Sequence, residues 1–173
     1  MKRFLFPVEY YRSTYNIDFK HYYDLGYRGI IFDIDNTLVP HDAMSDERSR
    51  KLLKDLREIG FKIIFLSNND EPRVKNFAKE INADGLSTIN YIYKAKKPLK
   101  DSYIKAAALL KIETKNMLFI GDQIFTDILG ANNASIHSIL VDKVNKKEDA
   151  HIYLKRILEY PVKGLYLMKH RKK

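Results

Sequence analysis

Cysteine is absent from the 173 residues of this chain. The chain therefore forms no disulfide bond and no thiolate metal site, and no reaction can use a cysteine nucleophile. Any chemistry must come from carboxylates, hydroxyls and lysines.

Long apolar runs are absent as well. No segment approaches the roughly 18 apolar residues of a membrane-spanning helix. The first residues begin like a signal peptide, but Pro7, Glu9 and Arg12 interrupt them before an adequate apolar core forms. We therefore expect a cytoplasmic protein, with peripheral contact to a membrane left open.

Acidic residues are fewer than basic ones. The 22 Asp and Glu residues face 31 Lys and Arg residues, so the formal net charge is +9. This excess favours anionic partners but does not separate nucleic acid from anionic lipid or a small phosphate. The length predicts one domain, residues 1–173, that buries roughly 70% of the surface of its unfolded chain.

Strand-like and helix-like segments alternate along the chain. Five strands are predicted, the third of them weakly, at 30–33, 61–66, 86–89, 117–120 and 136–141. Five helices are predicted, from the cap Ser45 to Ile59 with Gly60 as the stop, from Pro72 to 81, and at 99–110, 126–131 and 148–160. This alternation predicts an α/β fold with right-handed crossovers and a mostly parallel sheet.

Two carboxylates follow the first predicted strand. In a strand, residues i and i+2 share a face, so we expect Asp33 and Asp35 to leave the sheet together. Two anions on one face repel each other unless a cation lies between or beside them. Hard oxygen ligands of this kind suit Mg²⁺, so the sequence predicts a metal and phosphate site here.

Further polar residues follow other predicted strands. Ser67 ends the second strand, and Gly121 with Asp122 ends the fourth. Ligands of a parallel sheet bind beyond the carboxyl ends of its strands. We therefore expect these separated motifs to converge on one cleft with Asp33 and Asp35.

At these residues the sequence resembles the haloacid dehalogenase superfamily, whose phosphatases carry four ordered motifs. Asp33-Ile34-Asp35-Asn36-Thr37 resembles the first motif and Ser67 the second. Lys97 before Pro98 resembles the third, and Gly121-Asp122 with Asp127 the fourth. The resemblance covers about residues 27–142, and the first and fourth motifs are specific. It implies a Rossmann-like, three-layer α/β/α fold.

A closer resemblance is to the YqeG family of that superfamily. It rests on Pro7-Val8-Glu9-Tyr10, the Ile17-Asp18 step, the run 29–32 before the first motif, Lys94-Ala95-Lys96-Lys97-Pro98, and Gly121-Asp122-Gln123 with Thr126-Asp127. Those relatives are phosphatases without a large cap domain, and they are similar to mitochondrial phosphatidylglycerophosphate phosphatases.

The resemblance implies a metal-assisted mechanism for phosphate transfer. Asp33 is the expected nucleophile, which forms an aspartyl-phosphate. Mg²⁺ is expected on an Asp33 oxygen, the Asp35 backbone carbonyl and Asp122, with Asp127 supporting the metal. Asp35 is the expected general acid and then the general base.

The resemblance also implies which groups hold the phosphate. Lys97 is expected beside the phosphate oxygens, where Ser67 and the backbone near Asn68 donate hydrogen bonds. Thr37 is expected to brace the loop that carries both aspartates.

Several of these residues have a structural alternative. Asp127 can act only by improving a helix start, Ser67 by capping a turn, and Lys97 as part of a solvated lysine run. Pro98 favours a defined backbone direction at Lys97. His41 follows the first motif, but we interpret it as a surface-loop histidine rather than a substrate contact.

The spacing of the motifs leaves no room for a lid domain. An open cleft admits bulky phosphorylated substrates such as lipid head groups, proteins or nucleic-acid ends. Aromatic and basic residues gather in both flanks, which is typical of a membrane interface. The alternative is that the aromatic residues complete the core and that the C-terminal tail is solvated.

Three hypotheses for function remain open. The first is a Mg²⁺-dependent phosphomonoesterase, with phosphatidylglycerophosphate at a membrane surface as a candidate substrate. The second is a nucleic-acid- or ribosome-associated basic protein with incidental phosphatase activity, although no recognised nucleic-acid motif supports it. The third is a switch in which the aspartyl-phosphate persists. Asp35 argues against persistence because it is expected to activate the hydrolytic water.

Overall fold

The computed structural model describes residues 3–145 and 150–170, without the side chains of residues 3, 150–157 and 170. Its centre is a six-stranded sheet in the order β1-β6-β5-β2-β3-β4, with all neighbouring strands parallel. The strands are β1 (Glu9–Tyr11), β2 (Gly29–Phe32), β3 (Lys62–Leu66), β4 (Asn90–Ile92), β5 (Met117–Gly121) and β6 (His137–Val141).

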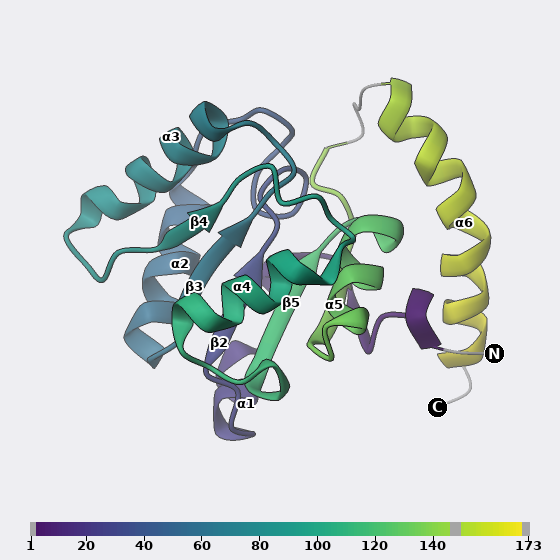
Figure 1. The fold of residues 1–173 in the computed structure, drawn as a ribbon, viewed down its shortest axis with the longest axis horizontal. Helices are drawn as coiled ribbons and strands as arrows, with labels where there is room; N and C mark the ends of the chain where they lie inside the picture. Colours follow the sequence, from purple (N-terminus) through teal and green to yellow (C-terminus); the bar gives the residue numbers. More distant parts are fainter. Residues whose placement is uncertain (1–2, 146–149, 171–173) are drawn as a thin grey trace.

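Helices connect the strands and cover both faces of the sheet (Figure 1). They are α1 (Phe19–Asp24), α2 (Glu47–Ile59), α3 (Glu71–Ile81), α4 (Lys100–Leu110), α5 (Leu129–Asn133) and α6 (Ala150–His170). Short single turns are η1 (Arg3–Leu5), η2 (Thr14–Asn16), η3 (Asn82–Asp84), η4 (Thr114–Asn116) and the π-helical η5 (Ile124–Ile128). Among the described residues, no helix has the length and apolar character needed to cross a membrane.

Alternate residues of the central strands build two separate cores. Ile30 and Phe32 of β2 pack with residues of α1, α2 and α3, whereas Ile31 packs with residues of α4 and α5. Side chains alternate between the faces of a strand, so a strand buried on both faces must be apolar throughout, as β2 is. The structure therefore has the predicted three-layer α/β/α architecture.

The connections between the motifs contain no lid domain. Between Asp35 and Ser67 the regular elements are α2 and β3, and between Ser67 and Lys97 they are α3, η3 and β4. The carboxyl ends of the central strands therefore carry no additional domain between these motifs, as predicted.

Two local predictions are wrong. The strand predicted at 86–89 is β4, Asn90–Ile92, at the edge of the sheet. Residue Ile89 is in a loop, where the Asn82 side chain hydrogen-bonds both its backbone nitrogen and its carbonyl. The cap of α2 is Asp46, whose carboxylate accepts from the Ser49 backbone nitrogen. Ser45 instead donates its hydroxyl to Glu80.

The ends of the chain differ most from the prediction. The short strand β1 was not predicted, and it extends the sheet by pairing with β6. The last helix was predicted at 148–160. Glu148 lies outside the described residues, and α6 continues past Pro161 to His170. Proline lacks only one backbone donor, and the packing of neighbouring residues can maintain a helix through it.

Candidate active site

The predicted motifs meet at the carboxyl ends of β2, β3 and β5. A cavity of about 240 Å³ opens there. Its lining residues come from the segments that follow β2, β3, β4 and β5: Asp33, Asp35, Asn36, His41, Ser67, Asn68, Asn69, Lys97, Gln123 and Thr126. Parallel strands place their carboxyl ends on one edge, which explains why segments distant in sequence converge here.

Lys97 lies at the centre of the buried charges. Its ammonium donates to Asp33 Oδ1 at 2.5 Å and to Asp127 Oδ1 at 2.7 Å. Burial alone would lower the pKa of this lysine, but the two carboxylates outweigh that effect and raise it above its usual value. Lys97 is therefore a fixed positive charge and not part of a solvated run.

Asn68 holds the backbone of Lys97 in place. The Lys97 backbone nitrogen donates to Asn68 Oδ1 at 2.8 Å, and Asn68 Nδ2 donates to the Lys97 carbonyl at 3.3 Å. The side chain of Asn68 thus orients the lysine. It also lines the cavity, so the predicted contact with substrate stays a prediction.

Asp33, Asp122 and Asp127 form a compact carboxylate cluster. Oxygens of the three residues lie within 4.8 Å of one another, and all three residues are buried. Burial is the main cause that raises the pKa of Asp33. Asp127 and Asp122 raise it further by repulsion, and Lys97 opposes the rise. Carboxylate oxygens of three buried residues this close together fit a divalent cation with a preference for oxygen ligands.

Thr37 links two members of this cluster. Its hydroxyl lies 3.2 Å from Asp33 Oδ2 and 3.4 Å from Asp122 Oδ1. A single hydroxyl proton serves one of these oxygens at a time. Thr37 therefore contacts the predicted nucleophile directly, in addition to its position in the loop.

Asp127 reaches the cluster from the turn η5. The Gln123 backbone nitrogen donates to Asp127 Oδ2 at 3.0 Å, while the other carboxylate oxygen binds Lys97. Gly121 permits this approach, since a Cβ added there would lie 2.5 Å from Asp127 Oδ2. The carboxylate is thus part of the site, and its contribution is not limited to the start of a helix.

Asp35 turns toward different partners. Its carboxylate accepts from Arg73 Nη2 at 2.9 Å, from Asn69 Nδ2 at 2.8 Å and from the Asp42 backbone nitrogen at 2.8 Å. Asp33 and Asp35 both line the cavity, as expected of two carboxylates that leave the sheet together. Each has its own cation, Lys97 for Asp33 and Arg73 for Asp35.

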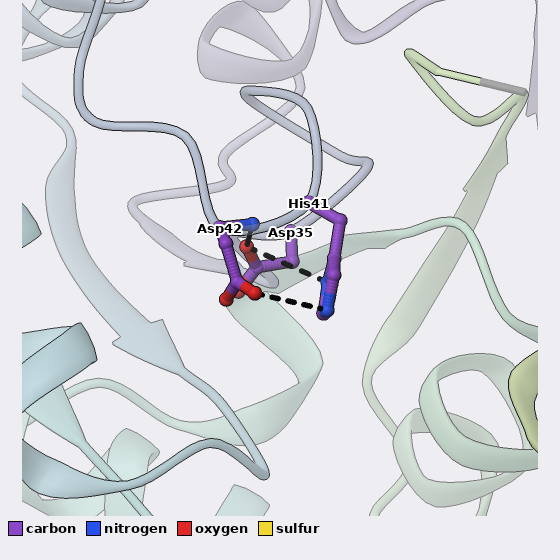
Figure 2. Close-up of side chains that lie close together, drawn as sticks. All are labelled: Asp35, His41 and Asp42. Carbon is purple, nitrogen blue, oxygen red and sulfur yellow. Dashed lines mark hydrogen bonds and ion pairs between the residues drawn. The ribbon is translucent and has the colours of Figure 1, made fainter. Parts of the chain in front are cut away.

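His41 lies beside Asp35 at the cavity wall. Its Nδ1 is 3.9 Å from Asp35 Oδ1, and its Nε2 is 3.5 Å from Asp42 Oδ2 (Figure 2). Oxygen and nitrogen atoms of these three residues are close enough to ligate a metal. The Asp35 carboxylate already has three donors, one of them cationic, so this group is a poorer cation site than the buried cluster. His41 is partly exposed in its loop and also lines the cavity, so the surface-loop interpretation stays a prediction.

Ser67 is buried at the end of β3. Its hydroxyl oxygen accepts from the Asn69 backbone nitrogen at 3.1 Å, and the residue lines the cavity. The hydroxyl hydrogen is not used by that contact and can donate to a ligand. Both the turn role and the predicted phosphate contact are thus compatible with its position.

Arg73 and Asn69 were missed by the sequence analysis. Both bind the Asp35 carboxylate, and Asn69 also lines the cavity. Asn69 lies only two residues after Ser67, so its closeness in sequence to a predicted site residue could have identified it. Arg73 had none, because its contact with Asp35 depends on where α3 begins.

Solved structures share this fold. An uncharacterized protein from Listeria monocytogenes serotype 4b aligns with a TM-score of 0.54 and 18% identity over 82% of this chain and 99% of that chain. The β-phosphoglucomutase of Clostridium difficile aligns with a TM-score of 0.51 and 15% identity over 79% of this chain and 99% of that chain. At these identities the similarity establishes the fold alone.

Sequence comparison establishes the family. A model of haloacid dehalogenase-like hydrolases matches residues 41–135. The protein named "Probable phosphatase YqeG" of Bacillus subtilis (strain 168) is 34% identical over 142 residues, which cover 82% of this chain and 79% of that protein. The chain belongs to the haloacid dehalogenase-like hydrolases and is therefore an enzyme. The resemblance to this superfamily and to the YqeG family is confirmed.

Proposed function

We propose that the chain is a Mg²⁺-dependent phosphomonoesterase that works through an aspartyl-phosphate on Asp33. The observation that carries the proposal is the meeting of Asp33, Asp122 and Asp127 around Lys97 in one buried cluster beside a cavity. The similarity to a protein named as a probable phosphatase supports the same reaction class.

The residues present fit a magnesium ion. Carboxylates of Asp33 and Asp122 and the backbone carbonyl of Asp35 would hold it, with Asp127 supporting the cluster from its hydrogen bonds to Lys97 and Gln123. When bound there, Mg²⁺ supplies positive charge that screens the approach of a carboxylate to a phosphate anion.

The chain's own residues carry the two chemical steps. An Asp33 oxygen attacks phosphorus, the bond from phosphorus to the ester oxygen breaks, and the Asp35 carboxyl group gives its proton to the leaving alkoxide. Asp35 then takes a proton from water, whose oxygen attacks the phosphorus of the aspartyl-phosphate. Inorganic phosphate leaves and the Asp33 carboxylate is restored.

Lys97 and Ser67 hold the phosphate during both steps. Lys97 contributes a fixed positive charge close to the attacking oxygen, and the Ser67 hydroxyl is available to donate to a phosphate oxygen. Because these donors are already positioned by Asn68 and Asn69, little reorganisation is needed when charge develops.

The proposed substrate is a bulky phosphomonoester, with phosphatidylglycerophosphate as the first candidate. The lack of a lid domain between the motifs supports this choice, because an open cleft excludes water poorly around a small substrate. The net charge of +9 supports an anionic surface as the source of the substrate.

Phosphate release from lipid, nucleotide, sugar and protein phosphates, measured with Mg²⁺ and after its removal by a chelator, tests the proposal. We expect Mg²⁺-dependent release that falls by at least about 10³-fold in Asp33→Asn while the fold persists. Asp101→Asn, at an exposed position in the first turn of α4, is the matched control and should keep full activity. Unchanged turnover in Asp33→Asn would remove the proposed nucleophile.

A further inference from the structure

The outward side of α6 is apolar. Its exposed residues include five large apolar side chains, 39% to 64% exposed, which we call the α6 apolar face: Leu158, Tyr160, Leu165, Leu167 and Met168. Glu159 and Tyr166 of the same helix are buried. Residues seven apart lie on nearly the same side of a helix. Glu159 and Tyr166 therefore define the inward side of α6, and the α6 apolar face occupies the side exposed to solvent.

Inward contacts determine this orientation. The Tyr166 ring meets the Phe6 ring edge-on with centroids 6.0 Å apart, and Glu159 Oε1 accepts from the Phe125 backbone nitrogen at 2.9 Å. Lys163 pairs with Asp142 at the end of β6. The helix is therefore attached to the body by its inward side, at the outer edge of the molecule beside the N-terminal segment (Figure 1).

Charge distinguishes between possible occupants of this face. The sequence from residue 150 to 173 contains seven Lys and Arg residues and a single acidic residue, the buried Glu159. A second copy of the chain would bring another +9 to this basic region, so self-association would work against repulsion. An anionic surface would gain attraction and could also take up the apolar side chains.

We propose that the α6 apolar face docks the protein on an anionic lipid bilayer. An apolar helix side in a basic segment of sequence is typical of helices that lie in the interface plane, where burial of the apolar residues and attraction to anionic lipid add up. In this proposal α6 lies along the bilayer surface, because its buried residues Glu159 and Tyr166 keep the opposite side of the helix on the body of the protein.

Docking on α6 places lipid next to the catalytic cluster. A second cavity of about 240 Å³ lies between α6 and the strand ends, and its lining includes Asp122, Lys143, Tyr160 and Lys163. Tyr160 belongs both to this lining and to the α6 apolar face. The claim that docking presents a lipid substrate to the active site rests on the proposed lipid phosphatase activity. The claim that α6 binds the bilayer does not depend on that activity.

Vesicle cosedimentation tests the docking. The full chain is mixed with vesicles of phosphatidylcholine alone or of equimolar phosphatidylcholine and phosphatidylglycerol. We expect binding to the anionic vesicles only, weakened by salt, and a loss of about tenfold or more in the double variant Leu165→Glu, Met168→Glu. The matched control is the double variant Ile104→Glu, Leu109→Glu on α4, which adds the same two negative charges at positions 46% and 48% exposed.

Hydrolysis of a small soluble phosphomonoester separates docking from catalysis. The double variant should keep the wild-type rate on this substrate, which also shows that it folds. Failure of the wild-type chain to bind anionic vesicles, or equal binding by the double variant, overturns the docking proposal whatever the activity. A dimer in solution that the double variant abolishes would assign the face to a second copy and overturn it too. The activity of Asp33→Asn on the soluble phosphomonoester tests the proposed function and does not test the docking.

Discussion

Arg73 donates through Nη2 to Asp35 Oδ1 at 2.9 Å, and the same nitrogen donates to the Ala43 carbonyl at 2.6 Å. One guanidinium group therefore ties α3 to both the first motif and the loop after it. Its Nε and Nη1 atoms are buried without a hydrogen-bond partner in the described part of the chain. Because the hydrogen bond and ion pair of Arg73 fix the Asp35 carboxylate, we interpret Arg73 as a positioning residue for Asp35.

Arg73→Gln should lower turnover. Without its cation, Asp35 retains Asn69 and the Asp42 backbone nitrogen but loses a fixed orientation. General acid–base catalysis contributes roughly 10²- to 10⁴-fold, so we expect kcat to fall by about tenfold or more with little change in KM. Steady-state kinetics on a soluble phosphomonoester measure this.

Lys75→Gln is the control for Arg73→Gln. It removes one positive charge from the exposed side of the same helix. We expect wild-type kinetics from this variant. An equal loss in both variants would show that the general charge of α3 matters rather than the contact with Asp35.

Asp35→Asn should make the proposed intermediate accumulate. The amide cannot take a proton from the hydrolytic water, whereas Asp33 remains able to attack a substrate with a good leaving group. The reaction is stopped with acid, and the phosphate bound to the protein is located by peptide mapping. We expect the phosphate on Asp33. A wild-type protein that retains phosphate for as long as this variant would favour the switch hypothesis instead.

Lys97→Met should destabilise the protein. Removing the ammonium leaves Asp33 and Asp127 without their shared partner, and breaking a buried ion pair in this way costs about 3–5 kcal/mol. Urea unfolding should show this loss in the free energy of unfolding. Added Mg²⁺ should recover more stability in the variant than in the wild type, because a cation stabilises the unpaired carboxylates.

The control for that variant is Lys105→Met on the exposed side of α4, which should unfold like the wild type. Equal stability of Lys97→Met and the wild type would contradict the central role of the lysine charge.

Gly121→Ala should disturb Asp127. The added Cβ would lie 2.5 Å from Asp127 Oδ2 and 2.6 Å from its Cβ and Cγ, so η5 must shift. We expect a loss of about 1–3 kcal/mol in the free energy of unfolding and weaker activation by Mg²⁺. Gly164→Ala meets no atom within 4 Å and should gain up to about 1 kcal/mol, since alanine favours a helix. Normal Mg²⁺ activation in Gly121→Ala would argue against a role for Asp127 near the metal.

The attachment of β1 should depend on pH. His137 Nε2 donates to Glu9 Oε1 at 2.9 Å, and this hydrogen bond is the main cause that lowers the pKa of Glu9, with burial opposing it. A carboxyl group with a lowered folded pKa stabilises the fold above its unfolded pKa of about 4.3, and the contribution is lost as the pH falls through the folded pKa. Glu9→Gln should therefore be less stable at neutral pH by under about 1 kcal/mol, given the exposure of Glu9. Thermal melts should converge in acid; a constant difference would exclude this carboxylate as the cause.

Much of the site was predictable because its residues follow strands. The runs at β2 and β5 are apolar throughout, which identifies buried parallel strands, and the polar residues directly after them had to lie at the ligand-binding edge. The convergence of Asp33, Ser67 and Asp122 needed no side-chain detail. The strand at 86–89 was misplaced because the apolar pattern there is short and Asn82 binds the backbone of Ile89 instead.

Sequence by itself determined the α/β class, the order of the motifs and the edge of the sheet where they meet, because apolar periodicity and turn residues report local structure and burial. Only the tertiary structure decided that Lys97 neutralises Asp33 while Arg73 neutralises Asp35, that β1 completes the sheet, and that α6 leaves an apolar face outward. These features depend on contacts between residues far apart in the chain. Whether such a contact forms is set by the packing of whole helices and strands, which no local pattern encodes.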